Sequence, residues 1–167
     1  MLLQAIPTPS VPSSDRGGRN VVRVYLISDG RLKAAARTSD DTSVRSMVDL
    51  LAEGPTASEK AAGATTAIAP GGFVVEQAPS SRSRRDSVVI EVPVQFTQID
   101  GDLQLLATAQ LVWTVTEPQP LWLVRMTFNG EPIELPTDEG LTSGPVGRSD
   151  YAAVAPKNSP LAAPDDQ

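Results

Sequence analysis

Residues 101–130 constrain the fold more than any other part of the chain. The segment 102–116 has the unbroken pattern of an amphipathic helix, and the prolines at 118 and 120 predict where it ends. Residues 121–128 alternate apolar and polar side chains, as a half-buried strand does, and Asn129-Gly130 predicts a turn after them. Both tryptophans of the chain, Trp113 and Trp122, lie in this unit. We therefore expect residues 101–130 to form the centre of the hydrophobic core.

The two ends of the chain differ from the middle in composition. Residues 1–20 are rich in proline, serine and glycine, and residues 155–167 are rich in proline and polar residues. Such sequences bury too little apolar surface to offset the entropy lost on ordering. We predict a disordered tether over residues 1–20, one folded domain with a C-terminal arm over residues 21–154, and a disordered tail over residues 155–167.

Strands and helices are both predicted between these ends. Residues 21–27 and 31–37 flank Asp29-Gly30, a dipeptide typical of tight hairpin turns. One helix is predicted after a cap at Asp41 or Thr42, and a short one begins at the capping box of Thr56. Further strands are expected over residues 73–77 and 88–96, the second broken at Pro93. This order indicates an α+β fold, a two-layer sandwich with a small, mostly antiparallel sheet and two helices on one face.

Composition excludes several kinds of functional site. The 167 residues contain no cysteine and no histidine, which excludes zinc sites of the usual type and Ser-His-Asp or Cys-His nucleophiles. The net charge of −6 disfavours nucleic acids and anionic membrane surfaces as partners, because both would repel the chain. The acidic pairs lack the spacing of a calcium-binding loop, and we expect neither a metal nor a cofactor. These pairs are Asp40-Asp41, Asp138-Glu139 and Asp165-Asp166.

Two charged clusters leave a functional interpretation open. Arg82, Arg84 and Arg85 could bind phosphate or an anionic wall polymer, although a solvated hairpin loop explains them more simply. Glu76 and Glu91 lie on predicted strands and could face each other as the carboxylate pair of a glycosidase. The chain has few aromatic side chains to stack on a sugar. We therefore expect a protein that is not an enzyme.

A set of short motifs, in their order and spacing, resembles a known family. The motifs are Val24-Tyr25-Leu26 with Asp29-Gly30-Arg31-Leu32, the segment Leu50-Leu51-Ala52-Glu53-Gly54-Pro55-Thr56, Thr66-Ala67-Ile68-Ala69-Pro70-Gly71, Val88-Val89-Ile90-Glu91-Val92, Ala109-Gln110-Leu111-Val112-Trp113-Thr114, and Val124-Arg125-Met126 through Phe128-Asn129-Gly130-Glu131-Pro132. Together they resemble the GerMN domain, the sporulation and spore germination domain, in the form found in actinobacterial lipoproteins. The resemblance covers about residues 21–135, and Arg148-Ser149-Asp150-Tyr151 is similar to an arm that often follows the domain.

The resemblance implies a compartment and a kind of role. Such proteins are extracytoplasmic and are usually held on the outer face of the cytoplasmic membrane by a lipid on an N-terminal cysteine. An anchor of that kind would have to lie outside these 167 residues, which contain no cysteine. The resemblance implies a binding or assembly module for an envelope protein or a cell-wall component, with self-association as a further expectation. The alternative is a receptor domain for a small ligand or a cell-wall glycan.

The candidate interface follows from the expected two-layer architecture. A sheet covered by helices on one face leaves the other face for water or a partner. Strand alternation assigns seven residues to that open face, with the aromatic ones as anchors for a partner. They are Arg23, Tyr25, Ile27, Val89, Glu91, Trp122 and Arg125. Trp113, by contrast, is predicted to pack in the core.

Overall fold

The computed structural model describes residues 19–79 and 87–157. The elements in chain order are β1 (Asn20–Ser28), β2 (Arg31–Ser39), α1 (Val44–Ala52), α2 (Ala57–Ala61), β3 (Val74–Gln77), β4 (Ser87–Glu91), α3 (Val94–Thr97), α4 (Gly101–Val115), β5 (Leu123–Phe128), β6 (Glu131–Pro132), β7 (Leu135–Thr137), β8 (Gly140–Thr142) and the 3-10 helix η2 (Arg148–Val154). No helix within the described ranges is both long enough and apolar enough to cross a membrane. Most of the predicted tether and most of the predicted tail lie outside these ranges, and Asn20, the last residue assigned to the tether, begins β1.

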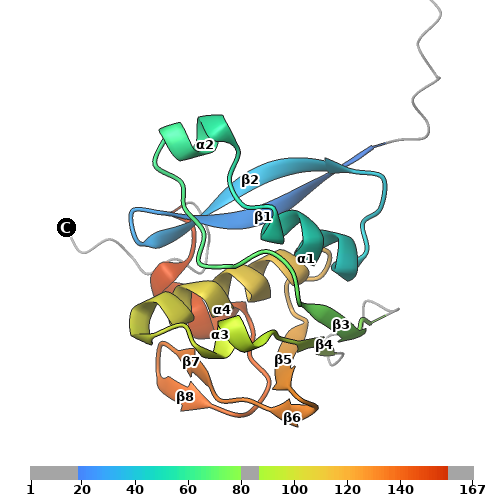
Figure 1. Ribbon diagram of the computed structural model, residues 1–167, viewed down its shortest axis with the longest axis vertical. Coiled ribbons are helices and arrows are strands. Elements are labelled where there is room, and N and C mark those ends of the chain that lie inside the picture. The colour runs from blue at the N-terminus through green and yellow to red at the C-terminus, as the bar shows by residue number, and fades with distance from the viewer. Residues whose placement is uncertain (1–18, 80–86, 158–167) are drawn as a thin grey trace, which may run out of the picture.

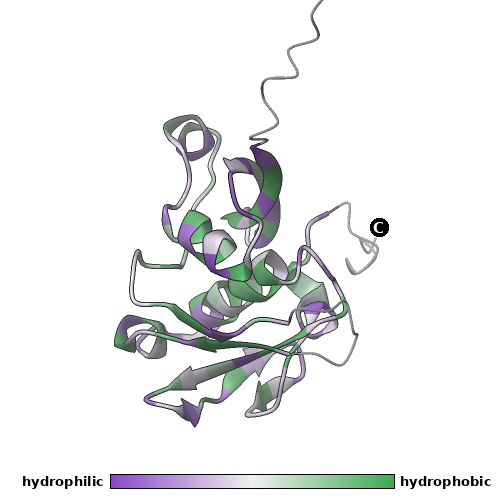
Figure 2. Cartoon of the chain, turned by 90° about the vertical axis from the view of Figure 1, so that its right-hand side faces the viewer, coloured by the Kyte–Doolittle hydropathy of each residue, from purple (hydrophilic) through white to green (hydrophobic). Residues whose placement is uncertain are grey.

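Helix α4 lies at the centre of the molecule, between the β1–β2 hairpin and the four-stranded sheet (Figures 1 and 2). Every residue from Ala107 to Val115 is buried, so the second half of α4 has no solvent-facing side. The sequence predicts the helix and its role as core, and both are confirmed. The prediction of a single buried stripe is wrong for this half, because elements pack against α4 from several directions.

The described strands form three sheets. Strands β1 and β2 make a hairpin, β3-β4-β5-β6 make a four-stranded sheet, and β7 and β8 make a second hairpin. Strands β4 and β5 run parallel, and the other described strand pairs are antiparallel. Parallel neighbours need a long crossover connection, and the segment that contains α3 and α4 supplies it. The α+β class is confirmed, while the one sheet expected from the sequence is divided into three.

Two Xaa-Gly turns set the hairpins as predicted. Asp29 and Gly30 both have positive φ, 54° and 74°, and Asn129 and Gly130 have φ of 53° and 78°. Positive φ at both central residues is the mark of the type I′ turn, whose twist matches that of the flanking strands. Pro93 ends strand β4 as expected, but the chain then forms the short helix α3 instead of continuing as a strand.

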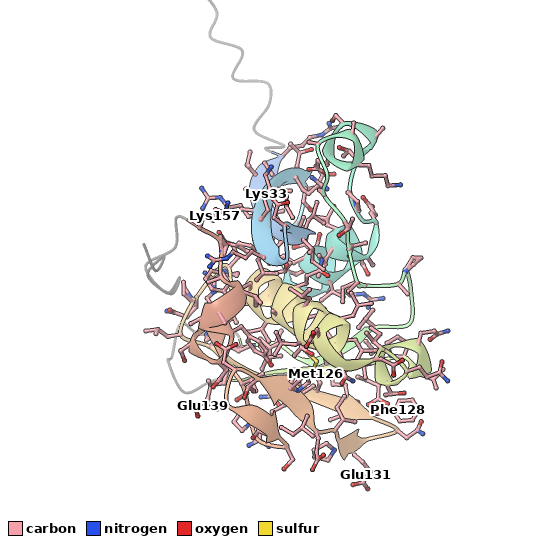
Figure 3. All side chains as sticks on the ribbon, turned by 90° about the vertical axis from the view of Figure 1, so that its left-hand side faces the viewer. Lys33, Met126, Phe128, Glu131, Glu139 and Lys157 are labelled. Carbon is pink, nitrogen blue, oxygen red and sulfur yellow. The ribbon has the colours of Figure 1, made fainter. Side chains whose placement is uncertain are left out.

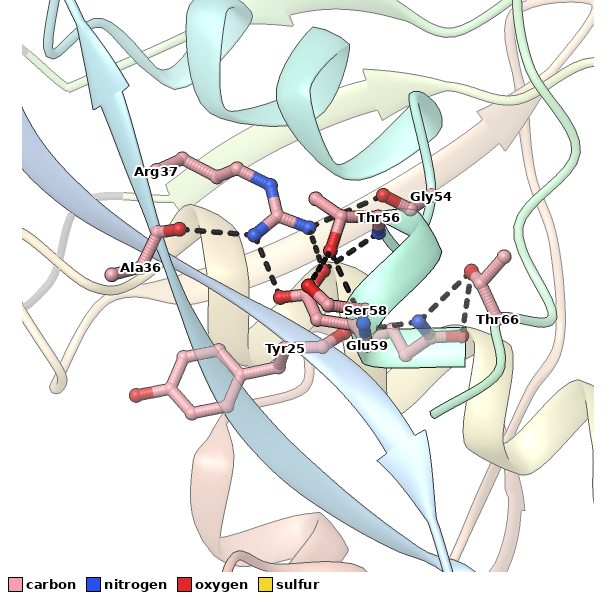
Figure 4. A network of polar contacts seen from close by, with 9 residues as sticks. Tyr25, Ala36, Arg37, Gly54, Thr56, Ser58, Glu59 and Thr66 are labelled. Carbon is pink, nitrogen blue, oxygen red and sulfur yellow. Dashed lines mark hydrogen bonds and ion pairs between the residues drawn. The ribbon is translucent and has the colours of Figure 1, made fainter. Parts of the chain in front are cut away.

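The helix caps place α1 and α2 on the hairpin. Ser43, one residue after the predicted caps, caps α1, because its hydroxyl accepts the N–H of Ser46. The capping box of α2 is confirmed, with Thr56 and Glu59 each accepting the other's backbone N–H. Arg37 on β2 reaches Glu59 at 2.6 Å and donates to the carbonyl of Gly54, which ties α2 to the hairpin (Figure 4).

The C-terminal arm is part of the core. Leu135, Val146, Tyr151 and Ala155 are each at most 1% exposed. Strand β7 and helix η2 both pack against α4, and Val146 exchanges two backbone hydrogen bonds with Val124. The sequence predicts an arm here but not the β7–β8 hairpin. The predicted tail boundary at residue 155 is too early, because Ala155 is fully buried.

Candidate functional site

The structure divides the seven predicted interface residues between two places. Strands β1 and β4 belong to different sheets, so residues of β1 cannot share one sheet face with those of β4 and β5. Arg23, Tyr25 and Ile27 lie on the hairpin, and Trp122 immediately precedes β5. The remaining three, Val89, Glu91 and Arg125, do share the face of the four-stranded sheet that turns away from the core.

Three of the seven residues are buried rather than exposed. Tyr25 is 5% exposed, Ile27 6% and Trp122 6%, so the prediction that they lie on an open face is wrong. The reason is that β1 is covered on both sides. The ring of Tyr25 packs edge-on against that of Trp113 in α4, with 5.4 Å between centroids, and Ile27 exchanges backbone hydrogen bonds with Thr65. Trp122 therefore loses its assigned role as an exposed anchor.

Tyr25 belongs to a polar cluster that fastens the C-terminal arm to the domain. The Arg148 guanidinium lies over the Trp113 ring at 4.5 Å and donates hydrogen bonds to the Thr116 hydroxyl and the Trp113 carbonyl, both at 2.8 Å. It also donates to the Glu117 carboxylate at 2.9 Å. We call this set, Tyr25, Trp113, Thr116, Glu117 and Arg148, the Arg148 clasp. A cation at the end of α4 also complements the partial negative charge of the helix C-terminus.

The Arg148 clasp keeps the side chain of Tyr25 away from solvent. The Tyr25 hydroxyl donates to Glu117 Oε2 at 2.8 Å. Burial, and then this hydrogen bond to a carboxylate, raise the pKa of Tyr25 to about 12. Arg23 is the exposed member of the neighbourhood, with its guanidinium 3.7 Å from Glu117 Oε1. The cluster is thus a structural joint between β1, α4 and the arm.

Three of the predicted interface residues, Val89, Glu91 and Arg125, lie on one surface of the four-stranded sheet. Val89 lies beside Arg125 in the β4–β5 register, and Val74 lies beside Glu91 in the β3–β4 register. Val74 is 56% exposed, Arg125 is exposed, and Val89 and Glu91 are half-buried. We call these four residues, together with Glu76, the outer sheet face. It combines one exposed and one half-buried valine with one cation and two carboxylates.

Glu91 has a structural task on this face. Its carboxylate accepts the Thr127 hydroxyl at 2.5 Å and the backbone N–H groups of Asn129 and Gly130, so it holds the β5–β6 turn. These hydrogen bonds, that of Thr127 first, lower the pKa of Glu91. Glu76 lies close by and accepts from the same Thr127 hydroxyl at 3.2 Å. The pair thus meets as predicted, and the lowered pKa of Glu91 means that this carboxyl does not supply the raised-pKa general acid that a glycosidase needs beside its ionised carboxylate.

The other candidate sites give weaker support for a function. Arg82, Arg84, Arg85 and the pair Asp165-Asp166 lie outside the described residues. Within residues 19–79 and 87–157, no three acidic side chains come together in a way that could hold a metal ion. A hollow of about 420 Å³ lies between the turn end of the β1–β2 hairpin and Pro156-Lys157, lined largely by polar and charged residues.

Comparison with known proteins assigns the family. The sequence model of the Germane family, described as sporulation and spore germination, matches residues 13–134. The chain belongs to this family. The tandem GerMN domains of the sporulation protein GerM from Bacillus subtilis have a similar structure, with a TM-score of 0.53 and 18% sequence identity. The similarity covers 80% of this chain and 46% of that one. Because the sequence identity is low, the similarity shows the fold alone. No curated protein matches the sequence.

The family match and the folded unit do not end at the same residue. The match stops at residue 134, whereas the buried residues of the Germane domain continue to Ala155. The arm that supplies Arg148 therefore completes the domain from outside the matched region. Sequence reasoning noted the Arg148-Ser149-Asp150-Tyr151 motif but found no local signal for the β7–β8 hairpin, which consists of only three residues on each strand.

Proposed function

We propose that this chain is a non-enzymatic binding or assembly module of a bacterial envelope protein that acts in a process of the sporulation or germination type. Membership of the sporulation and spore germination family supports the process. The observation that carries the binding role is the outer sheet face, where the exposed Val74 stands beside Glu91 and Val89 stands beside Arg125. Exposed apolar side chains with a polar rim are typical of protein interfaces.

The geometry of this face suits a protein partner. The sheet beneath it is rigid, because Val88, Ile90, Val124 and Met126 on the opposite face are at most 2% exposed. Glu91 is fixed by three hydrogen bonds and loses little freedom when a partner binds. Arg125 lies in the adjacent row and supplies a charge that orients a partner. A sheet face that is packed from beneath and carries a few fixed polar groups favours a macromolecule over a small substrate.

We place the partner in the cell envelope. The resemblance to extracytoplasmic lipoproteins supports an outer-face location, with an N-terminal lipid anchor on a segment outside this chain. An envelope protein is the proposed partner, and a cell-wall component is the alternative. The alternative gains support from the hollow of about 420 Å³ near Lys33 and Lys157, whose ammonium groups would suit an anionic wall polymer (Figure 3).

Site-specific photo-crosslinking in the native cell tests the proposal. A photoreactive amino acid at Val89 should crosslink the chain to a protein of the envelope. The same amino acid at Leu141, which is 67% exposed on β8, is the control and should give no such product. Equal crosslinking at both positions, or crosslinking at neither, would overturn the assignment of the outer sheet face. Crosslinking to glycan at a site near Lys33, with none at Val89, would favour the alternative.

A further inference from the structure

The two outer edges of the β1–β2 hairpin differ in how far the rest of the domain satisfies their backbone groups. A two-residue turn joins Ser28 to Arg31, so these residues form a hydrogen-bonded pair, and the pairing then alternates along both strands. Two of the residues of β1 that point away from β2 find partners. Ile27 exchanges hydrogen bonds with Thr65, and the N–H of Tyr25 donates to the Thr114 hydroxyl at 3.1 Å. The half of the outer edge of β1 nearer the turn is therefore paired with the rest of the domain, whereas within the described residues the backbone groups of Val21 and Arg23 have no such partner.

The outer edge of β2 is open. The same alternation turns the backbone groups of Leu32, Ala34, Ala36 and Thr38 away from β1. Over residues 19–79 and 87–157, no group accepts a hydrogen bond from the N–H of Ala34, Ala36 or Thr38. The carbonyl of Ala36 accepts from its neighbour Arg37. Ala34, Ala36 and Thr38 are all exposed. A row of unpaired backbone groups on a nine-residue strand is a template for another strand.

A small apolar hollow lies beside this edge. It has a volume of about 150 Å³ and lies between β2 and α2. Leu26, Ala35, Ala62 and Ala64 supply its apolar lining, and Lys33, Ser58 and Glu59 are polar members of its wall. The Arg37–Glu59 ion pair, which is 2.6 Å long and largely shielded from solvent, keeps α2 in place over the strand (Figure 4). The hollow is thus a fixed feature that can receive a side chain.

The charge at the edge identifies the kind of strand that fits. Lys33 is exposed on β2, and Lys157 lines the adjoining hollow with it (Figure 3). The charge of Arg37 is matched by Glu59. Among the residues that the structure describes, Lys33 has no ion-pair partner, so the edge favours a strand that carries a carboxylate opposite Lys33.

We propose that the free edge of β2 binds an extended, acidic segment of a partner protein, which adds to the hairpin as a third strand. The odd-numbered residues of β2 face α2, as the contact of Arg37 with Glu59 shows. Partner residues opposite Lys33 and Ala35 lie on that same side and are two positions apart, because strand side chains alternate. The segment therefore carries a carboxylate opposite Lys33 and, two residues away, an aliphatic side chain that enters the hollow. Main-chain hydrogen bonds give such complexes their affinity and alternate side chains their specificity.

The inference rests on the proposed binding role but uses a surface separate from the outer sheet face. Selection from a displayed library of random nonapeptides against the immobilised chain tests it. We expect enrichment of sequences with an acidic and an aliphatic residue two positions apart. Ala34→Pro removes an outward N–H and should weaken binding of a selected peptide about tenfold or more, as should Lys33→Glu.

A matched control is available on the other strand. Val21 is 72% exposed, and its N–H also points away from the hairpin pairing, so Val21→Pro removes a comparable group on the opposite edge. It should leave peptide binding unchanged. Because Ala34→Pro could disturb folding, amide hydrogen exchange of the unaltered chain gives a second reading. The peptide should slow exchange at residues 34, 36 and 38.

The outcomes separate the two proposals. No enrichment, or selected peptides whose binding survives both Ala34→Pro and Lys33→Glu, would overturn the β2 edge. A dimer that forms without peptide and is lost in Ala34→Pro would replace the acidic segment by a second copy. The crosslink from Val89 should persist in the Ala34→Pro variant, since it reports on the outer sheet face.

Discussion

Replacing Arg148 by alanine should test whether the C-terminal arm is an integral part of the domain. The side chain of Arg148 is 10% exposed and lies between Trp113 and Tyr25, with distances of 4.5 and 5.6 Å from its guanidinium carbon to the two ring centroids. It joins the arm to α4 through three hydrogen bonds. The variant removes all of these interactions together.

The magnitude follows from what the truncation leaves behind. Breaking a buried ion pair by removing one partner typically costs about 3–5 kcal/mol. Here Glu117 is 22% exposed and keeps the Tyr25 hydroxyl and the more distant Arg23, which places the loss at the lower end. We expect a loss of about 3 kcal/mol in the free energy of unfolding. At ~4 °C per kcal/mol for a domain of this size, the melting temperature should fall by about 12 °C.

Thermal unfolding followed by circular dichroism provides the measurement. The matched control is Arg125→Ala, because Arg125 is exposed and surface substitutions usually change stability by less than about 0.5 kcal/mol. Arg148→Lys keeps the charge but loses the planar fork, and should fall between the two. If Arg148→Ala lowers the melting temperature no more than Arg125→Ala, the clasp does not hold the arm and our reasoning fails.

Three further outcomes follow from buried or paired side chains. Trp122→Ala should cost about 3–5 kcal/mol in chemical denaturation, because Trp122 is core, and a change below about 1 kcal/mol would contradict its burial. Glu59→Gln keeps the capping box but removes the ion pair with Arg37. That pair lowers the pKa of Glu59 from 4.5 to about 2, so it stabilises the fold above pH 4.5 and is lost as the pH falls toward 2. The variant should therefore lose less stability than the unaltered protein over that window, and equal losses would refute the pairing. Burial raises the pKa of both Tyr25 and Tyr151, so absorbance titration of the folded protein at pH 10–11 should show no tyrosinate, whereas the denatured protein should show it.

Local signals in the sequence predicted the elements that depend on neighbouring residues. Asp29-Gly30 and Asn129-Gly130 need positive φ, which few residues other than Gly, Asn and Asp adopt readily, and both form turns. The capping box from Thr56 to Glu59 is a four-residue pattern and is also present. Pro93 ends a strand because it has no N–H to donate. Each of these features can be derived without knowledge of the rest of the fold.

The errors arose where distant elements decide burial. Alternation along β1 assigned Tyr25 and Ile27 to an open face, but α4, the Arg148 arm and Thr65 cover that side. A strand covered on both sides and a half-covered one can share the same short pattern. Trp122 was assigned outward for the same reason. The Arg148 clasp joins residues 123 positions apart along the chain, and nothing local in the sequence marks such a joint.

The predicted positions that agree with the structure are those that depend on register within one sheet. Val89, Glu91 and Arg125 lie on the outer face because β4 and β5 are direct neighbours with their other faces in the core. The use of Glu91 as a support for the β5–β6 turn could not be predicted, since it depends on where Asn129 and Gly130 fold back.

The central claim is that this domain binds an envelope partner through its outer sheet face, separately from what keeps it folded. The most direct test places a photoreactive amino acid at Val74, on that face, in chains with and without Arg125→Glu. We predict that the crosslink to the partner is lost in Arg125→Glu while the melting temperature changes by less than about 2 °C, as for an exposed residue. A crosslink of undiminished yield in the folded variant would contradict the claim.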